Sequence, residues 1–199
     1  MSDALIRAGL LDADDAAGFL RRGHFAYESG DHGEVWLELD RLFAQPRRLQ
    51  RAAEALAQRL AAHGADLVCG PLVGGALVGQ CVAAALDARF VAAAPNPDGA
   101  SIRYTVPSSV RSLAAGARAI VVDDVINAGS AALACVRELQ ALGATLVALG
   151  SLAVRAASVL PIEAFAGLPL EALAAVEWSL WPPASCPLCA AGAPLTPPA

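Results

Sequence analysis

The chain has 199 residues, of which 56% are hydrophobic, and a formal net charge of −5. This length suits one domain with a sizeable core. All 14 basic residues are arginine, and the acidic balance argues against nucleic acid as a bulk partner, because phosphate backbones require clustered cations. Residues Met1 to Arg7 lack the basic-then-apolar pattern of an export signal, so we expect a cytoplasmic protein.

The stretch from Leu67 to Leu86 carries no charge and has the length needed to span a bilayer. It contains Gly70-Pro71 and Gly74-Gly75, which divide it into a strand, a turn and a helix. Each part is then too short to cross a membrane. We therefore expect a buried strand followed by a buried helix, and no membrane span.

In chain order, periodicity predicts alternating helices and strands. Helices are expected at Asp3–Leu10, Asp14–Arg22, Pro46–His63, Gly75–Leu86 and Ala131–Leu142, short strands around a turn within Gly23–Leu39, and further strands at Asp66–Gly70, Arg89–Ala93, Ala119–Val122 and Thr145–Ser151. The segment Ala94–Gly116 is rich in Pro, Ser, Gly and Asn, with a short β-like run at Ser101–Val106, and is the candidate for a mobile arm. The alternation predicts an α/β fold with a parallel sheet.

Two adjacent carboxylates, Asp123 and Asp124, follow the apolar run Ala119–Val122 where that strand should reach the sheet edge. A small-residue turn, Asn127–Ser130, then leads into a helix. The N–H groups and positive dipole end of a helix suit a phosphate, and the carboxylates suit ribose hydroxyls or a hydrated cation. A sugar phosphate meets both requirements. Solvated loop acids are the alternative; a phospho-receiver site would need a later Asp as acceptor, and none follows Asp124.

A second glycine-containing loop, Gly70–Ala76, follows the strand Asp66–Gly70 and also ends at a helix N-terminus. In parallel α/β sheets ligands bind outside the carboxyl ends of the strands, so this loop is expected beside the acid pair. Its glycines allow backbone N–H groups to approach an anion closely. A tight turn that needs glycine for its geometry is the competing interpretation.

The segment Ala119–Ala131 resembles the phosphoribosyl diphosphate (PRPP) signature of the type I phosphoribosyltransferases, an apolar run followed by D/E-D-V-x-x-x-G-x-S/T. The resemblance implies that Asp123 and Asp124 hold the ribose hydroxyls. It implies a 5′-phosphate loop made of Val125, Ile126, Asn127, Ala128, Gly129, Ser130 and Ala131, and a pyrophosphate loop made of Pro71, Leu72, Val73, Gly74 and Gly75.

Further motifs resemble the orotate phosphoribosyltransferases. They are Gly23-His24-Phe25 with Ser29-Gly30-x-His32, then Gly70-Pro71-x-x-Gly74-Gly75, and finally Trp181-Pro182 with Cys186-Pro-Leu-Cys189-x-x-Gly192-x-Pro194-Leu195. The resemblance implies one domain over residues 1–199, with a parallel-sheet core at about 46–180, a small hood from about 20–45 plus the C-terminal edge, and a mobile arm at about 94–116. It also implies that Phe25 packs on the nucleobase, while Ser29 and Gly30 hydrogen-bond to it.

The activity implied is transfer of the phosphoribosyl group of PRPP to a nucleobase, orotate first, with Mg²⁺ held mainly through PRPP and water rather than by protein ligands. A homodimer is implied as well. Arms of this family supply Lys, whereas this arm offers only Arg103, expected to act in catalysis, and Arg111, expected to bind substrate. A PRPP-binding regulator with weak or no orotate turnover, and a transferase for another nucleobase, remain as alternatives.

The five cysteines are expected to be reduced thiols. Cys186-Pro-Leu-Cys189 has zinc-knuckle spacing, but a zinc site needs four ligands and no second cysteine pair follows. We therefore expect no protein-held metal. His24, His32 and His63 have no partner that the sequence reveals; the first two are expected in the hood and His63 at the surface.

Overall fold

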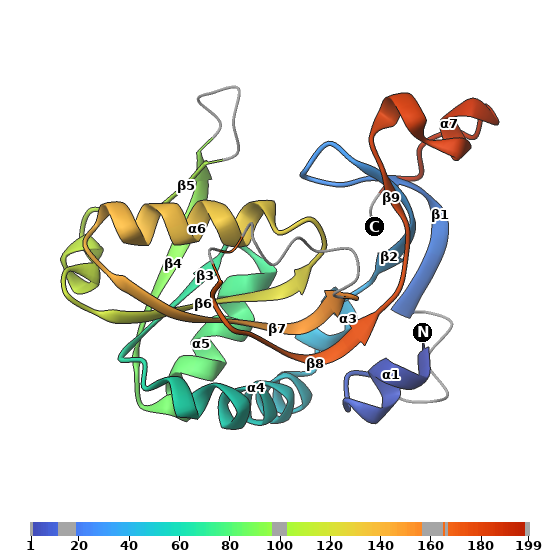
Figure 1. Ribbon diagram of the computed structural model, residues 1–199. Coiled ribbons are helices and arrows are strands. Elements are labelled where there is room, and N and C mark those ends of the chain that lie inside the picture. Colours follow the sequence, from blue (N-terminus) through green and yellow to red (C-terminus); the bar gives the residue numbers. More distant parts are fainter. Residues whose placement is uncertain (1, 12–18, 97–102, 157–164, 166, 198–199) are drawn as a thin grey trace.

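The computed structural model describes residues 2–11, 19–96, 103–156, 165 and 167–197, which form a six-stranded sheet and a smaller three-stranded sheet (Figure 1). The larger sheet, in the order β5-β4-β3-β6-β7-β8, contains β3 (Leu67–Pro71), β4 (Arg89–Asn96), β5 (Arg103–Thr105), β6 (Arg118–Ile126), β7 (Thr145–Arg155) and β8 (Leu170–Val176). All neighbours are parallel except β4 and β5. The predicted α/β fold with a parallel sheet is confirmed.

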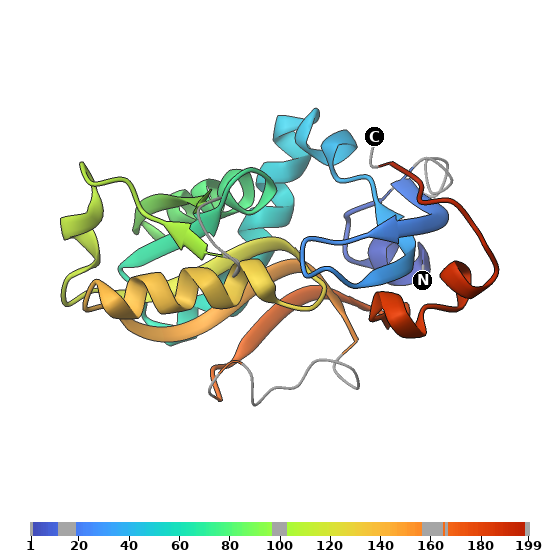
Figure 2. The same cartoon turned by 90° about the horizontal axis from the view of Figure 1, so that it is seen from above.

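Helices cover both faces of the larger sheet (Figures 1 and 2). On one face lie α4 (Pro46–Leu60), continued by a 3-10 turn at Ala61–His63, and α5 (Gly74–Leu86); on the other lies α6 (Ser130–Ala141). These bounds match the predicted helices closely. Two short helices, α1 (Ser2–Arg7) and α3 (Asp40–Phe43), join the α4 and α5 side.

The central strand β6 shows why the apolar run forms a doubly covered strand. Ile120 and Val122 belong to the hydrophobic cluster under α4 and α5, whereas Ala119 and Val121 belong to the cluster under α6. All four side chains are fully buried. Because successive side chains of a strand point to opposite faces, this run is apolar throughout rather than alternating.

Strand β6 is longer than predicted and contains the acid pair. Its pairing with β3 ends at Val121, but its pairing with β7 continues through Asp123, which lies opposite Ser151, to Ile126. The predicted end of the strand at Val122 is therefore wrong on the β7 side and correct on the β3 side. The carboxylates consequently lie beyond the end of β3 while a regular strand still holds their backbone.

The smaller sheet has the order β1-β2-β9 and is antiparallel, with β1 (Leu20–Ala26), β2 (His32–Leu37) and β9 (Leu180–Trp181). The predicted strands around a turn within Gly23–Leu39 are thus present. The helix predicted at Asp14–Arg22 is wrong from Leu20 onward, because those residues pair with Leu37, Trp36 and Val35 of β2; residues 14–18 lie outside the described part. The C-terminal helix α7 (Pro187–Ala190) lies beside this sheet (Figures 1 and 2).

The candidate arm is partly regular structure. Strand β4 continues to Asn96, three residues beyond the prediction, because Ala94–Asn96 pair with β5. A 3-10 turn at Arg111–Ala114 follows, and the side chain of Ala114 is fully buried. Residues 97–102 of the predicted arm lie outside the described residues. Among the helices that the structure describes, none combines the length and the apolar composition required to cross a membrane.

Candidate functional site

A cavity of about 250 Å³ opens at the carboxyl ends of β3 and β6, beneath the smaller sheet. It brings together three segments that are far apart in the sequence: the loop Pro71–Gly75, the acid pair with Val125, and the turn Asn127–Ala131. Parallel strands end at one edge of a sheet, so the loops that follow them meet there. The two glycine-containing loops and the diacid therefore face a single space.

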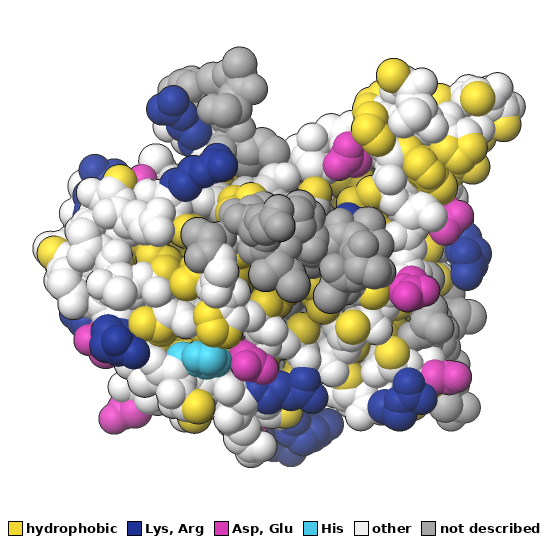
Figure 3. Space-filling model, viewed as in Figure 1, with side chains coloured by type: hydrophobic (Ala, Val, Ile, Leu, Met, Phe, Trp, Pro, Cys, Tyr) yellow, Lys and Arg dark blue, Asp and Glu magenta, His cyan; other side chains and the backbone are white. Residues whose placement is uncertain are grey.

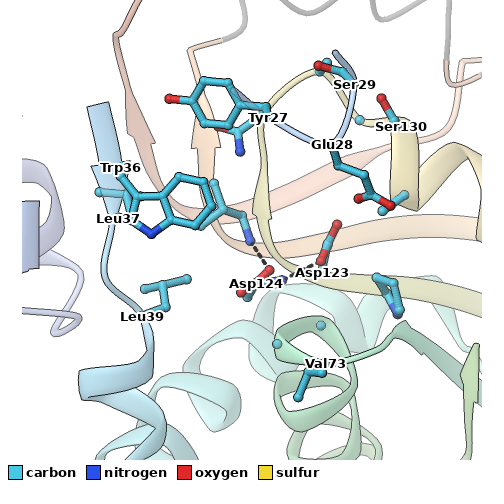
Figure 4. A pocket seen from close by; sticks show the side chains of 18 of the residues that line it. Tyr27, Glu28, Ser29, Trp36, Leu37, Leu39, Val73, Asp123, Asp124 and Ser130 are labelled. Atoms are coloured by element: carbon cyan, nitrogen blue, oxygen red, sulfur yellow. Dashed lines mark hydrogen bonds between the residues drawn. The ribbon is translucent and has the colours of Figure 1, made fainter. Parts of the chain in front are cut away.

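The acid pair lies at the floor of this cavity (Figure 4). Asp123 is only 7% exposed, and its Oδ1 accepts the N–H of Asp124 at 3.0 Å. Asp124 Oδ1 accepts the N–H of Val125 at 2.8 Å. Burial raises the pKa of Asp123 well above its usual range, and the neighbouring Asp124 carboxylate raises it further. Burial also raises the pKa of Asp124, although the hydrogen bonds that it accepts oppose the shift.

Glycine at the start of α5 allows the loop Pro71–Gly75 to lie against the carboxylates. A Cβ atom on Gly74 would lie 2.1 Å from Asp124 Oδ2, and one on Gly75 would lie 2.7 Å from Asp123 Oδ1. Both distances are shorter than any Cβ contact allows. Close packing of loop and acids thus requires these glycines, which brings the backbone at the N-terminus of α5 to the cavity wall.

The turn before α6 forms the opposite wall. Gly129 has φ +81°, a conformation that favours glycine, and a Cβ atom there would lie 2.4 Å from the Phe165 ring. Behind this turn, the buried Arg155 donates from Nε to the carbonyl of Asn127 at 3.5 Å. Burial lowers the pKa of Arg155, and Asp31 opposes this. A guanidinium beside the turn gives it a positive environment, which suits an anion.

The smaller sheet supplies an aromatic wall above the acids, made by Tyr27 and Trp36, whose rings stack with centroids 6.0 Å apart (Figure 4). Tyr27 donates its hydroxyl to the Val35 carbonyl, and burial raises its pKa to about 12. Phe25, predicted to pack on the nucleobase, does not line the cavity. It is fully buried with its ring 5.7 Å from Trp36, so Trp36 and Tyr27, and not Phe25, face the cavity.

A hydrogen bond across the cavity joins the turn between β1 and β2 to strand β5 of the larger sheet. Tyr104, in β5, donates its hydroxyl to Glu28 Oε1 at 2.8 Å, and both residues line the cavity. Burial raises the pKa of Tyr104, and Glu28 raises it further. Glu28 also raises the pKa of Asp123, so two neighbouring carboxylates, Asp124 and Glu28, repel the charged form of Asp123 in the cavity. Such a site favours a ligand or ion that carries positive charge or donates hydrogen bonds.

Most residues predicted for the site line this cavity: Ser29, Pro71, Leu72, Val73, Gly74, Gly75, Asp123, Asp124, Val125, Asn127, Ala128, Gly129, Ser130 and Ala131. Five predicted residues do not: Phe25, Gly30, Arg103, Arg111 and Ile126. Ile126 is 1% exposed and belongs to the core cluster under α6, because its side chain alternates with that of Val125. Gly30 occupies the hairpin turn with φ +85°.

The two arm arginines lie on the side of the molecule where β5 meets α6. Basic side chains gather near the β4–β5 hairpin in Figure 3. Arg103 lines a second cavity together with Arg137 and Glu138. Arg111 donates to the Val106 carbonyl at 3.2 Å and lies 3.8 Å from Glu138. Tyr104 lines both cavities, so Arg103 is one residue from the candidate site without lining it.

Sequence reasoning missed several residues that line the cavity: Tyr27, Glu28, Val35, Trp36, Leu37, Leu39, Tyr104 and Trp178. An alternating strand has two faces, and the sequence does not say which face of β2 meets the acid pair. The sequence does contain a sign of these residues: two aromatic side chains, Tyr27 and Trp36, and one acid, Glu28, lie in the segment that was expected to form the hood over the site.

Comparisons with known proteins agree with this geometry. A family model described as a phosphoribosyl transferase domain matches residues 38–171. Curated relatives named orotate phosphoribosyltransferase include one from Campylobacter curvus, 33% identical over 89% of this chain and 91% of its own length, and one from Desulforamulus reducens, 30% identical over 96% of each. A solved structure of orotate phosphoribosyltransferase from Aeropyrum pernix superposes with a TM-score of 0.63 at 21% identity, covering 88% of this chain and 93% of that one.

Proposed function

The chain belongs to the phosphoribosyltransferase family, and on that premise we propose that it transfers the phosphoribosyl group of PRPP to orotate, giving orotidine monophosphate and pyrophosphate. The relatives that match nearly the whole chain at 30–33% identity carry the name orotate phosphoribosyltransferase, which supports the choice of base. We propose that the acting species is a cytoplasmic homodimer, an expectation that comes from the family resemblance alone.

The observation that carries the proposal is the convergence of two glycine-containing loops and one diacid on a single cavity. A phosphorylated pentose with a pyrophosphate group needs a phosphate cradle at each end and hydroxyl acceptors between them. The turn Asn127–Ala131 would hold the 5′-phosphate, and the loop Pro71–Gly75 the pyrophosphate. Asp123 and Asp124, which lie between these loops, would accept the ribose 2′- and 3′-hydroxyls.

In the proposed reaction a ring nitrogen of the base attacks ribose C1 as the bond from C1 to pyrophosphate breaks, and the proton of that nitrogen leaves with the pyrophosphate. Positive charge develops on the sugar ring, and the acid pair beneath it stabilises that charge. The aromatic wall of Tyr27 and Trp36 would hold the base flat above the sugar. The protein thus acts by orientation and electrostatics, and no described histidine lines the cavity to serve as a general base.

Magnesium fits this site through the chemistry of its donors. The carboxylate oxygens of Asp123 and Asp124 are of the type that Mg²⁺ prefers, and the repulsion among the acids would fall with a cation nearby. We propose that PRPP and water supply most of its ligands, with the acids contributing from the floor. When bound, the ion would neutralise pyrophosphate charge.

A second candidate function is PRPP binding without turnover. One observation favours it: among the described residues that line the cavity, none is Lys or Arg. Loss of one group that stabilises developing charge commonly lowers the rate by a factor of about 100 to 1,000. A protein that keeps both phosphate loops but lacks such a cation could bind PRPP and release it unchanged.

The test is an assay of pyrophosphate release from PRPP and Mg²⁺ with orotate, uracil, adenine and hypoxanthine in turn. Release with orotate alone supports the proposal. Release with another base and not with orotate would contradict it. PRPP binding with no release from any base would select the second candidate.

A further inference from the structure

Four side chains with metal-binding atoms meet at the edge of the smaller sheet, and none of them lines the candidate active site. His24 belongs to β1 and His32 begins β2. Cys186 directly precedes α7, and Cys189 lies within it. Figures 1 and 2 both place α7 next to this end of the smaller sheet. The two ligand pairs are more than 150 residues apart in the sequence, since His32 and Cys186 are separated by 154 positions (186 − 32).

The geometry of the cluster is close to that of a tetrahedral site. The ligand atoms of the four residues all lie within 4.8 Å of one another. His24 Nε2 lies 2.9 Å from His32 Nδ1, 3.5 Å from Cys186 Sγ and 3.6 Å from Cys189 Sγ, while Cys189 Sγ lies 3.2 Å from His32 Nδ1. Bond lengths to zinc of about 2.0–2.1 Å for nitrogen and 2.3 Å for sulfur give edges of roughly 3.3 Å between nitrogens and 3.5 Å between nitrogen and sulfur. The four distances given above differ from these edges by at most about 0.4 Å, and the two remaining pairs, which both involve Cys186 Sγ, lie within 4.8 Å.

A carbonyl fixes the tautomer of His24. Its Nδ1 lies 2.8 Å from the Ala193 carbonyl, which can only accept a hydrogen bond, so Nδ1 carries the proton. In the neutral ring Nε2 therefore presents a lone pair to the cluster. Metal-binding histidines are commonly oriented in this way, with the second ring nitrogen donating to a carbonyl or carboxylate.

A hydrogen-bonded cluster without an ion accounts for the arrangement less well. The single lone pair of His24 Nε2 has three neighbours, His32 Nδ1 and two thiols, and it can accept from only one of them at full strength. His24 is 4% exposed and Cys186 is 2% exposed, so water cannot readily supply hydrogen bonds to the polar groups that His24 Nε2 leaves without a partner. The exposed Cys189 provides a route for an ion to enter.

We propose that His24, His32, Cys186 and Cys189 bind one Zn²⁺ ion in a structural His₂Cys₂ site. Imidazole and thiolate in tetrahedral arrangement favour zinc among the common divalent ions. The expectation that Cys186 and Cys189 hold no metal is thereby revised, because it counted cysteines along the sequence and the missing ligand pair is two histidines from the other end of the chain.

The site has a consequence for the cavity. His24 and His32 flank the hairpin turn, and the residues between them include Tyr27, Glu28 and Ser29, which line the candidate active site. A zinc ion would join both strands of this hairpin to the C-terminal segment, which already bonds to β1 through Thr196 and His24. Zinc would thus order the part of the smaller sheet that covers the nucleobase.

The test begins with the full chain, prepared without a polyhistidine tag and under reducing conditions. Elemental analysis should find about one zinc per chain. After a chelator has removed the ion, Co²⁺ should bind in its place and give the visible absorption of a tetrahedral ion with thiolate charge-transfer bands. Hydrogen exchange in residues 27–31 should accelerate by at least about tenfold in the stripped protein, because local opening becomes easier.

Two variants and two controls complete the design. The double variant Cys186→Ser/Cys189→Ser and the single variant His32→Ala should each bind less than about a tenth as much zinc as the unchanged chain. Cys81→Ser and His63→Gln alter a half-buried thiol and a histidine outside the cluster, so their zinc content should not change. The double variant leaves both histidines in place, and normal folding of that variant by circular dichroism separates loss of the ion from loss of the fold.

Three outcomes would overturn the proposal. One is failure of the reduced, stripped chain to bind added zinc more tightly than about 1 µM, far weaker than structural sites. Another is equal zinc binding by the variants and the controls. The third is a disulfide between Cys186 and Cys189, identified by mass spectrometry of peptides from the unreduced chain, in freshly prepared protein that holds no metal.

Discussion

A Cβ atom added to Gly74 would lie 2.1 Å from Asp124 Oδ2, so the first residue of α5 and the second acid of β6 touch with no room for a side chain. This contact joins the loop proposed for pyrophosphate to the carboxylates proposed for ribose. Gly74→Ala must therefore displace either the loop or the acid. We expect the Kd for PRPP to rise at least tenfold, which corresponds to about 1.4 kcal/mol.

Calorimetric titration of PRPP into Gly74→Ala measures this effect, and Gln80→Ala on the exposed side of the same helix is the matched control. The control should retain the affinity of the unchanged chain. An unaltered Kd in Gly74→Ala would show that the contact between loop and acid has no part in binding.

The acid pair also makes stability depend on pH. Burial raises the pKa of Asp123 in the folded chain above its unfolded value, so the folded state binds a proton more tightly than the unfolded state. The stability contributed by this carboxyl is fully present below the unfolded pKa and is lost as pH rises through the raised folded pKa. Asp123→Asn keeps the Oδ1 acceptor for the Asp124 N–H but removes the charge. Its melting temperature should exceed that of the unchanged chain at neutral pH, by about 2–4 °C for each kcal/mol recovered.

Thermal unfolding of both proteins without ligand, from about pH 5 to pH 8, provides the measurement. The two curves should separate as pH rises, while PRPP binding by the variant is lost. Parallel curves over the whole range would contradict the assignment of a raised pKa to Asp123.

The conformation of Gly129 yields a prediction that separates strain from contact. Gly129→Ala suffers both a positive φ and a clash with the Phe165 ring. Gly116→Ala suffers a positive φ of +71° alone, because nothing lies within 4 Å of its added Cβ atom. Each should lose roughly 1–2 kcal/mol of stability from backbone strain. Only Gly129→Ala should also raise the KM for PRPP, by about tenfold or more, in the pyrophosphate-release assay.

If the two alanine variants lost stability equally and both kept the original KM, the turn Asn127–Ala131 would have no role in holding the 5′-phosphate. The stability of each variant is measured by urea unfolding under the same conditions.

Much of the core could be predicted because its determinants are local. The apolar run of β6, the spacing along α4 and the glycine loops each indicate their structure within a few residues. Strand β8 was not predicted, because Leu170–Val176 is rich in Ala and Leu, which favour helices, and only pairing with β7 makes it a strand. The orientation of Trp36 over the acids depends on how the two sheets meet, which no local pattern contains. The cluster that contains His24 and Cys186 was likewise not predictable, because it depends on how the C-terminal segment packs against β1 and β2.

The link between Tyr104 and Glu28 leads to a prediction about the nucleobase. Tyr104→Phe removes the hydroxyl that donates to Glu28 Oε1 but preserves the ring. A hydrogen bond to a carboxylate contributes roughly 1.5–3 kcal/mol. Glu28 is exposed to solvent, so the contribution here is smaller because water competes for its carboxylate. We expect the KM for orotate to rise by about three- to tenfold, while the Kd for PRPP in the absence of base changes less than twofold. A larger effect on PRPP than on orotate would argue against a role for this link on the base side.

Arg103 provides the prediction for the arm. Although it lines the cavity beside α6 rather than the candidate site, it is adjacent to Tyr104, which lines both. If it neutralises the departing pyrophosphate, Arg103→Ala should lower kcat about 100-fold with a smaller change in the Kd for PRPP. Arg89→Ala, which removes an exposed partner of Asp66, is the control and should leave kcat unchanged. An unaltered kcat in Arg103→Ala would remove Arg103 from the reaction.

The most direct measurement of the central claim is calorimetric titration of PRPP, with Mg²⁺, into the unchanged chain and into Asp124→Asn. A diacid that accepts the ribose hydroxyls between two phosphate loops predicts one PRPP per chain in the first titration. It predicts at least a tenfold weaker Kd in the second, because the half-buried Asp124 carboxylate, with two acceptor oxygens, becomes an amide with one. Absence of PRPP binding by the unchanged chain, or equal affinity in the two proteins, would contradict the account.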